Sequence, residues 1–274
     1  MMIPPPTPKR ALKKPAASPI RTRRTARILR SVVATDALLE LLSAEPAHAG
    51  LFLDFDGVLA PIVERPDDAA VPEETRRELA RLAQGYALVA VVSGRAGEDV
   101  AARVGLGGIV YVGSHGLELT PQAERWRSTL AAFAAAAPWP AEHIEVKGLS
   151  VAFHYRDRDR EDEAEAVLAL ERLAETARED GLVARFGRKI LEVLPPVGSN
   201  KGTAIRELLE QHGLTRALTA GDDVTDLDSF AALDGLELAV RVAVVDPESP
   251  ELLRESADVV LDSTAEFLDL LRRL

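Results

Sequence analysis

Two aspartates at the end of an apolar run are the first residues in this chain that suggest a chemistry. The sequence Leu51-Phe-Leu-Asp-Phe-Asp-Gly-Val-Leu59 predicts a buried strand, and Asp54 and Asp56 stand two residues apart at its end, on one face. Gly57 allows the chain to turn away there. Neighbouring carboxylates are tolerated when a cation or a shared proton lies between them, which indicates a divalent metal and acid–base chemistry. The alternative is an ordinary strand exit with solvated aspartates.

A second acidic strand end follows late in the chain, at Thr219-Ala-Gly-Asp-Asp-Val-Thr-Asp226. Asp222 and Asp223 stand where the apolar run ends, and Asp226 stands where the next helix is expected to begin. With the first pair, these acids would form an all-oxygen cluster, which suits Mg²⁺ better than zinc. One such end is often only a helix cap, but two in one sheet favour a metal site.

Two further motifs offer donors for an anion. Ser93-Gly-Arg95 follows an apolar run and presents a hydroxyl, backbone N–H groups and a guanidinium, which together could hold a phosphate. Ser199-Asn-Lys-Gly202 places Lys201 just before a predicted helix, where the ammonium and the helix N-terminus could face the same anion. The alternatives are a routine Ser-Gly turn and a solvated surface lysine.

Strands that alternate with helices must position these motifs. The chain predicts early strands over 51–54, 86–92 and 109–112 with helices over 35–42, 73–83 and 98–104, and late strands over 217–220, 238–244 and 258–261 with helices over 202–212, 226–233 and 248–255. Such alternation is typical of an α/β fold with a doubly wound, Rossmann-like parallel sheet. Ligands bind at the carboxyl ends of the strands in such a sheet, which is where the four motifs stand.

The pattern changes between residues 120 and 194. It predicts an αββαββ unit with helices over 125–137 and 160–178 and strands over 144–146, 151–156, 182–186 and 189–194. We therefore expect an inserted α+β cap domain over 120–194, a catalytic core made of 46–119 and 195–274, and a basic tail with a short helix over 1–45. An insert of this kind could act as a lid over the core.

Composition limits the function classes. The chain has 274 residues, 47% of them apolar, and no cysteine, which excludes disulfides, thiolate metal sites and thiol nucleophiles. It has neither a run long enough for a membrane span nor the apolar segment of a secretory signal, so we expect a cytoplasmic protein that does not bind membranes. We also expect no synthase domain within these 274 residues.

Charge is distributed unevenly along the chain. The net charge is −11, yet residues 1–30 hold nine Lys or Arg, six Pro and no acid, so the remainder carries −11 − 9 = −20. The composition of this segment predicts a disordered basic tail. The acidic remainder argues against nucleic acid as a substrate.

The order Asp-x-Asp-Gly, Ser-Gly-Arg, Asn-Lys-Gly and Gly-Asp-Asp-x-x-Asp resembles the four-part signature of haloacid dehalogenase superfamily phosphohydrolases. The resemblance implies a haloacid dehalogenase-like core and a two-step phosphoryl transfer. It also implies residue roles: Asp54 as nucleophile, Asp56 as general acid/base, Mg²⁺ held by Asp54, the Asp56 carbonyl and Asp222 with Asp223 and Asp226 behind them, and phosphate held by Ser93, Gly94 and Lys201.

A narrower resemblance covers about residues 50–270. The segments Leu59-Ala-Pro-Ile62, Gly113-Ser-His-Gly116, Lys147-Gly-Leu-Ser-Val-Ala-Phe-His-Tyr-Arg156, Leu191-Glu-Val-Leu-Pro195 and Gly221-Asp-Asp-Val-Thr-Asp226 are similar to those of trehalose-6-phosphate phosphatases. This resemblance implies hydrolysis of trehalose 6-phosphate to trehalose and phosphate, with Mg²⁺ as cofactor. The residues it implies for binding the sugar are Arg95, His115, Lys147, Arg156 and Glu192.

Several alternatives remain open at this point. The same core could hydrolyse another sugar phosphate, such as sucrose or mannosylglycerate phosphate, or work as a phosphomutase or a non-catalytic sugar-phosphate sensor. His154 could be a packed histidine, Arg156 part of a solvated charge run, and Lys147 with Glu192 an ordinary cross-strand pair. Val58 and Leu227 stand where these families commonly have threonine and glutamate. We expect activity to survive Val58, because the backbone N–H remains, while Leu227 puts in question a contact behind the metal ligands but none of the proposed ligands. The sequence does not indicate an oligomeric state.

Overall fold

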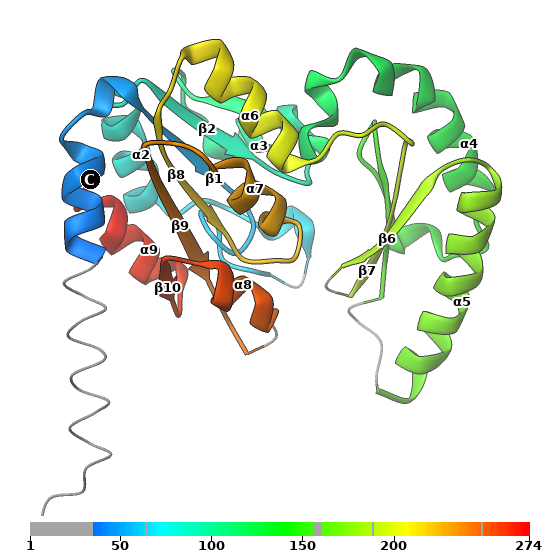
Figure 1. Cartoon of the computed structure of the whole chain (residues 1–274). Coiled ribbons are helices and arrows are strands. Elements are labelled where there is room, and N and C mark those ends of the chain that lie inside the picture. Colours follow the sequence, from blue (N-terminus) through cyan, green and yellow to red (C-terminus); the bar gives the residue numbers. More distant parts are fainter. Residues whose placement is uncertain (1–34, 64, 156–159, 188, 248) are drawn as a thin grey trace, which may run out of the picture.

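The computed structural model describes residues 35–63, 65–155, 160–187, 189–247 and 249–274. Its larger unit is built around a six-stranded parallel sheet (Figure 1). Its strands, in the spatial order β10-β9-β8-β1-β2-β3, are β1 (Ala49–Leu53), β2 (Leu88–Val92), β3 (Val110–Val112), β8 (Arg216–Gly221), β9 (Leu238–Val244) and β10 (Val259–Leu261). Leu51 on β1 pairs with Val89 on β2 and with Leu218 on β8. Strand β1, which directly precedes Asp54, is therefore central, and the sequence order reverses on its two sides.

Helices cover both faces of this sheet. Besides a helix over residues 35–43, they are α2 (Glu73–Gly85), α3 (Gly97–Val104), α6 (Lys201–His212), α7 (Asp226–Ala232), α8 (Glu251–Ser256) and α9 (Thr264–Leu271). Leu51 and Leu53 on β1 join the cluster that contains residues of α2, α3 and α9, whereas Phe52 joins the cluster beneath α6 and α7. This alternation on one strand shows why every position of β1 is buried. The predicted doubly wound α/β fold is confirmed.

The α9 helix is absent from the sequence prediction. It buries Phe267, Leu270 and Leu271 against the sheet, and its N-cap Ser263 accepts a hydrogen bond from the Glu266 backbone N–H at 3.2 Å. Serine followed three residues later by glutamate is a helix-start signal, and it stands directly after a predicted strand. The signal was available in the sequence and was missed.

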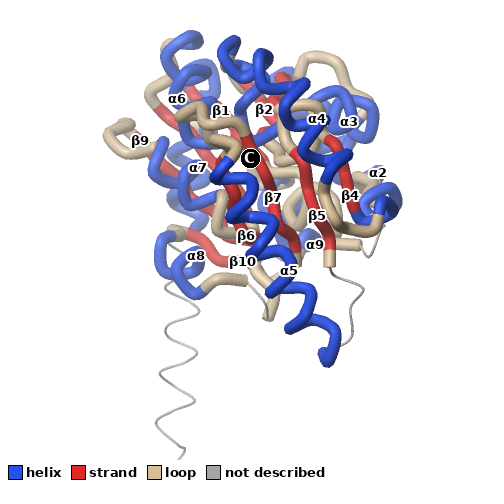
Figure 2. Tube along the Cα trace, turned by 90° about the vertical axis from the view of Figure 1, so that its right-hand side faces the viewer, coloured by secondary structure: helices blue, strands red, loops and turns tan. Residues whose placement is uncertain are grey.

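A separate four-stranded antiparallel sheet, the cap sheet, lies beside the core (Figure 1). Its strands, in the order β4-β5-β7-β6, are β4 (Ile144–Val146), β5 (Val151–His154), β6 (Val183–Gly187) and β7 (Ile190–Leu194), and its helices are α4 (Arg127–Ala136) and α5 (Arg160–Glu179). Figure 2 shows α5 crossing over this sheet. The αββαββ order and the antiparallel sheet match the prediction, while domain boundaries at 119/120 and 194/195 stay a prediction.

One face of the cap sheet is apolar and the other is polar. Phe153 and Leu191 pack beneath the helices, and the rings of Phe133 and Phe153 meet edge to face with centroids 6.1 Å apart. Because side chains alternate along a strand, His154 and Glu192 lie on the opposite face. This polar face carries Glu192, the sugar-binding candidate that lies on β7.

Short 3₁₀ segments connect the larger elements, and they are η1 (Pro46–His48), η2 (Pro66–Asp68), η3 (Ser114–Leu119), η4 (Pro121–Trp126) and η5 (Ala141–His143). Within η3, Ser114 and His115 have left-handed φ angles of 50° and 55°. Non-glycine residues rarely adopt this conformation, and it is held here by backbone hydrogen bonds from Ser114 N to Arg95 O and from His115 N to Ser93 O. The η3 turn is therefore fastened to the Ser93-Gly-Arg95 loop.

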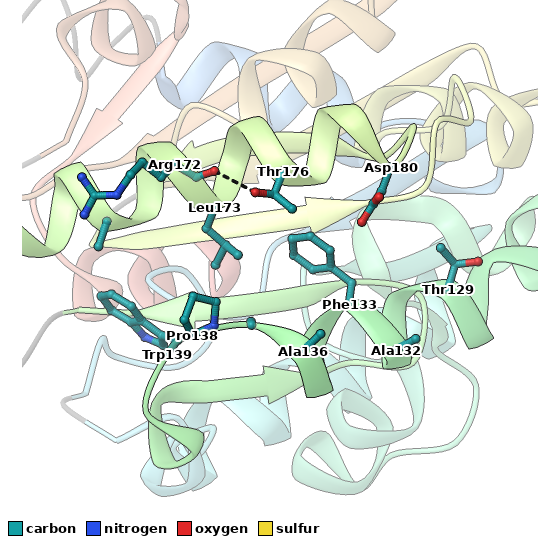
Figure 3. Close-up of a pocket in the computed structure, with 12 residues that line it drawn as sticks. Thr129, Ala132, Phe133, Ala136, Pro138, Trp139, Arg172, Leu173, Thr176 and Asp180 are labelled. Atoms are coloured by element: carbon teal, nitrogen blue, oxygen red, sulfur yellow. Dashed lines mark hydrogen bonds between the residues drawn. The ribbon is translucent and has the colours of Figure 1, made fainter.

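A cavity of about 810 Å³ lies between α4 and α5, with Phe133 and Leu173 facing each other across it (Figure 3). None of the described residues predicted for the site lines this cavity. The cavity is therefore distinct from the chemistry at the strand ends. Among the described residues, no helix has the length and apolar character needed to cross a membrane.

Candidate active site at the carboxyl edge of the parallel sheet

Asp54 is held directly after β1 by two donors. Lys201 Nζ lies 2.7 Å from Asp54 Oδ2, and the Phe55 backbone N–H donates to Asp54 Oδ1 at 2.7 Å. The side chain is only 9% exposed. Burial raises the pKa of Asp54 to about 7, because the loss of solvation and the charge of Asp226 outweigh the opposing effect of Lys201. A buried carboxylate with one oxygen on a cation is suited to attack an electrophile.

Lys201 reaches Asp54 because it is the first residue of α6. The preceding Asn200 caps the helix, with its side chain accepting from Thr203 N at 2.8 Å while Thr203 Oγ1 accepts from Asn200 N at 2.9 Å. Lys201 Nζ also donates to Asp226 Oδ1 at 2.8 Å. Burial alone would lower the pKa of Lys201, but the charges of Asp226 and Asp54 hold it well above its usual value. The lysine is thus a permanent cation at the site.

Asp226 organises the second acidic loop. Its Oδ2 accepts hydrogen bonds from the backbone N–H groups of Asp222 at 3.0 Å and Asp223 at 3.1 Å, while Oδ1 is taken by Lys201. Asp223 itself is half-buried, and its Oδ1 accepts from Val224 N at 2.7 Å. Both oxygens of Asp226 are therefore used by the protein, which fits the predicted place of this residue behind the metal ligands.

The acidic cluster fits Mg²⁺. Asp54, Asp222 and Asp226 bring one carboxylate oxygen each within 4.8 Å of one another. Burial, together with the charges of Asp54 and Asp226, raises the pKa of Asp222 well above its usual range, as expected for crowded carboxyls. Gly57, with φ of 75°, preserves the space, since a Cβ there would lie 2.3 Å from Asp222 Oδ2. An all-oxygen set of this kind is the preference of Mg²⁺.

The Ser93-Gly-Arg95 loop follows β2 at the same edge. Ser93 is buried, its backbone N–H donates to Val112 O at 2.9 Å, and its Oγ accepts from the Arg95 N–H at 3.2 Å. Arg95 turns toward Asp56, with Nε 2.7 Å from Oδ2 and Nη2 3.0 Å from Oδ1. Five of the predicted site residues therefore lie at the carboxyl edge of the parallel sheet, and they are Asp54, Asp56, Ser93, Arg95 and Lys201.

A second group joins the core to the cap sheet. His115 Nε2 lies 2.6 Å from Glu192 Oε2, and Lys147 Nζ lies 3.4 Å from Glu192 Oε1. Burial favours the neutral form of Glu192, but the charges of His115 and Lys147 outweigh it and hold the pKa of Glu192 well below its usual value. A Cβ on Gly94 would lie 2.7 Å from His115 Cε1, so the imidazole packs on the glycine of the Ser93-Gly-Arg95 loop.

Sequence reasoning gave no role to Glu145, which lies in this second group. Glu145 Oε2 is 2.9 Å from His154 Nε2 and 3.9 Å from Lys147 Nζ. Glu145 and Glu192 both stand opposite Ala152 in the strand register, so they lie on the same face of the cap sheet. The signal was the alternation Glu145-Val-Lys147 in an edge strand, which places both charges on one side.

His154 on β5 is more than a packed core histidine, because its side chain is half-buried and pairs with Glu145. Burial opposes ionisation of Glu145, but His154 and Lys147 outweigh it and lower the pKa of Glu145. Arg156, predicted to contact the sugar, lies outside the described residues.

The two departures from the family pattern have structural places. Val58 is 1% exposed and packs in the core cluster beneath β1, where a hydroxyl would have been buried. Leu227 is half-buried and packs on the apolar cluster that contains Phe230 of α7 and Leu253 of α8. Neither residue contributes a polar group to the acidic cluster.

Comparison with known proteins agrees with this geometry. The family model of trehalose-phosphatase matches residues 52–252. A trehalose-phosphate phosphatase of Mycobacterium marinum is 37% identical over 214 residues, which are 70% of this chain and 53% of that protein. The chain thus spans about half the length of the curated relatives it matches.

Solved structures share the fold. The C-terminal domain of the trehalose-6-phosphate phosphatase of C. albicans superposes with a TM-score of 0.71 at 21% identity, covering 86% of this chain and 94% of that one. A haloacid dehalogenase-like hydrolase from Bacteroides thetaiotaomicron gives a TM-score of 0.57 at 16% identity, covering 82% and 99%. The core is therefore haloacid dehalogenase-like, and on the family match this chain belongs to the trehalose-phosphatase family.

Proposed function

We propose that this protein is a Mg²⁺-dependent phosphatase that hydrolyses trehalose 6-phosphate to trehalose and phosphate, as a step of trehalose biosynthesis. The observation that carries the proposal is the buried Asp54 carboxylate on Lys201, beside Asp222 at the carboxyl edge of the parallel sheet. It is a nucleophile next to a cation and an acidic pocket, in a chain of the trehalose-phosphatase family.

The first step forms an aspartyl-phosphate. An Asp54 oxygen attacks phosphorus, the bond from phosphorus to the sugar oxygen breaks, and that oxygen takes a proton from the Asp56 carboxyl group. Lys201, Ser93 and the Gly94 backbone N–H bind the phosphoryl oxygens, on which negative charge builds up in the transition state. Trehalose then leaves with its hydroxyl restored.

The second step regenerates the enzyme. The Asp56 carboxylate takes a proton from a water molecule, the water oxygen attacks phosphorus, and the bond to Asp54 breaks to release phosphate and the Asp54 carboxylate. Mg²⁺, when bound by Asp54, the Asp56 carbonyl and Asp222, would neutralise charge on the phosphoryl group. Asp226 keeps the Asp222 backbone in place through its hydrogen bonds.

The polar face of the cap sheet supplies the sugar contacts in this proposal. Acceptors and donors lie close together here, with Glu192 2.6 Å from His115 and 3.4 Å from Lys147, and with Lys147 3.9 Å from Glu145. A disaccharide that takes over these contacts is matched by several groups at once. A site that binds hydroxyls in this way rejects an ester that lacks them. Arg156 stays a predicted member of this set.

Phosphate release tests the proposal. Wild type with Mg²⁺ is expected to release phosphate from trehalose 6-phosphate faster than from sucrose 6-phosphate or glucose 6-phosphate, and Asp54→Asn is expected to release none. A preference for another ester would keep the chemistry and change the substrate. Tight binding without turnover would favour the sugar-phosphate sensor. The cytoplasmic location and the lack of nucleic-acid binding stay predictions.

A further inference from the structure

Arg95 is oriented toward Asp56 and not toward the cap sheet. Its Nε donates to Asp56 Oδ2 at 2.7 Å and its Nη2 donates to Asp56 Oδ1 at 3.0 Å. A side-on pair of this kind fixes the plane of a carboxylate, which a point charge such as an ammonium does not. The guanidinium carbon also lies 5.3 Å from the centroid of the Phe55 ring. The orientation of the Asp56 carboxylate is thus set by a buried, packed arginine.

The other donors of Arg95 are directed at the protein as well. Nη2 donates to Pro66 O at 2.9 Å, and Nη1 donates to Asp99 Oδ2 at 3.2 Å. A guanidinium has five N–H groups, and with the two bonds to Asp56 four of them are engaged. The side chain is only 8% exposed, so little of Arg95 is left to contact a sugar.

Helix α3 holds Arg95 from behind. Arg103 Nε donates to both oxygens of Asp99, at 2.8 and 2.9 Å. Its Nη1 donates to the backbone oxygens of Asp67 and Ala69, both at 2.9 Å. Negative and positive charges alternate along a series of four side chains, which are Asp56, Arg95, Asp99 and Arg103. This series joins α3 to the loop that follows the first acidic motif. A rigid element therefore supports the contact to Asp56.

We propose that Arg95 is a positioning residue for the proton transfers of Asp56, anchored by Asp99, and not a sugar contact. The proposal rests on the proposed phosphatase function. A side-on arginine occupies one lone-pair site on each carboxylate oxygen, and the 35% exposure of the Asp56 side chain leaves the other sites open to a leaving group or water. Loss of this support lets the carboxylate rotate away from the reacting oxygens.

Leaving groups of different acidity separate this role from substrate binding. Departure of 2,4-dinitrophenolate needs no proton, whereas departure of an unsubstituted phenolate or a sugar alkoxide is assisted by one. A defect in the placement of Asp56 therefore slows aspartyl-phosphate formation most for the esters with the most basic leaving groups. A lost sugar contact cannot act on aryl phosphates at all.

The experiment measures single turnovers of 2,4-dinitrophenyl, 4-nitrophenyl and phenyl phosphate and of trehalose 6-phosphate, all with Mg²⁺. For Arg95→Lys we expect a near wild-type rate with the dinitrophenyl ester and a loss of about 10²-fold with phenyl phosphate, so that the rate depends more steeply on the phenol pKa. Asp99→Asn is expected to show the same trend more weakly. Arg77→Lys, on the exposed face of α2, is the matched control and should follow wild type.

Parallel dependences for wild type and Arg95→Lys would overturn the proposal. So would a rise in KM for trehalose 6-phosphate with unchanged kcat, which is the signature of a sugar contact. Equal losses on every ester together with a lower melting temperature would show a structural role only. The aryl series needs no sugar. If wild type hydrolyses aryl phosphates but not trehalose 6-phosphate, the proposed substrate is contradicted, while the aryl series still tests the positioning role of Arg95.

Discussion

The buried ammonium of Lys201 is placed between two carboxylates, Asp54 at 2.7 Å and Asp226 at 2.8 Å. Its side chain is 3% exposed, so neither carboxylate can exchange this partner for water. Removal of one member of a buried ionic set leaves uncompensated charge, which is more costly than the net stability of the intact set. The same residue thus serves both the stability of the core and the proposed phosphate site.

We therefore expect Lys201→Met to lower the free energy of unfolding by about 3–5 kcal/mol at pH 8 without Mg²⁺, measured by urea denaturation. The matched control is Lys189→Met, because Lys189 pairs with Glu163 while about a third of each side chain remains exposed. That change should cost under about 1 kcal/mol. A loss for Lys201→Met as small as for the control would contradict the ionic account of this site.

A glycine beside the acidic cluster gives the second prediction. In Gly57→Ala, the new Cβ would lie 2.3 Å from Asp222 Oδ2, and the backbone φ of 75° is unfavourable for alanine. We expect Asp222 to be displaced and Mg²⁺ affinity to fall at least about 10-fold, as measured by isothermal titration with Mg²⁺. Gly85→Ala, with no heavy atom within 4 Å of its Cβ, should leave the affinity unchanged. Equal affinities would show that Asp222 is not a metal ligand.

At the scale of elements, the proposed site residues are positioned by the first residues of helices and the last residues of strands. Alternation of strands and helices in the sequence was enough to predict the parallel sheet and the edge at which Asp54, Lys201 and Asp222 meet. The bond between Arg95 and Asp56 was not predictable, because no sequence spacing tells which way a side chain turns when two strand-end loops face each other. Glu145 was missed for a similar reason, since the face of the cap sheet on which it lies depends on the register of β4 against β5.

Two capped helices allow a matched test at this scale. Asn200 caps α6, which presents Lys201, and Ser263 caps α9, which lies on the opposite face of the sheet and carries none of the predicted site residues. Replacement of either cap by alanine should cost about 1 kcal/mol of stability by thermal or urea denaturation. We expect only Asn200→Ala to lower kcat in phosphate release as well, because of these two helices only α6 carries a proposed catalytic group. An unchanged kcat in Asn200→Ala would mean that Lys201 is placed without help from the cap.

At the scale of the whole molecule, the core and the cap sheet meet through the ion pair between His115 and Glu192. Glu192 lies on the polar face of the cap sheet, and its partner His115 lies on the η3 turn fastened to the Ser93 loop. The cap also approaches the second acidic loop, where a Cβ on Gly187 would lie 3.9 Å from Asp223 Oδ2. The proposed sugar groups thus hold the two units together when no sugar is bound, and a substrate has to compete for them.

This contact predicts a dependence of stability on acid. Because the folded pKa of Glu192 lies well below the ordinary value of 4.5, its contribution to stability is fully present above about pH 4.5 and is lost as the pH falls toward the folded pKa. In urea denaturation, Glu192→Gln should therefore be less stable than wild type at pH 7, and the difference should shrink between pH 5 and about pH 3. Small-angle scattering at pH 7 should show a larger radius of gyration for the variant, because its cap is no longer held by His115. Glu124→Gln removes an exposed ion pair with Arg127 on the same unit and should change neither quantity. A pH-independent difference, or an unchanged radius, would mean that packing holds the cap and that the Glu192 charge does not.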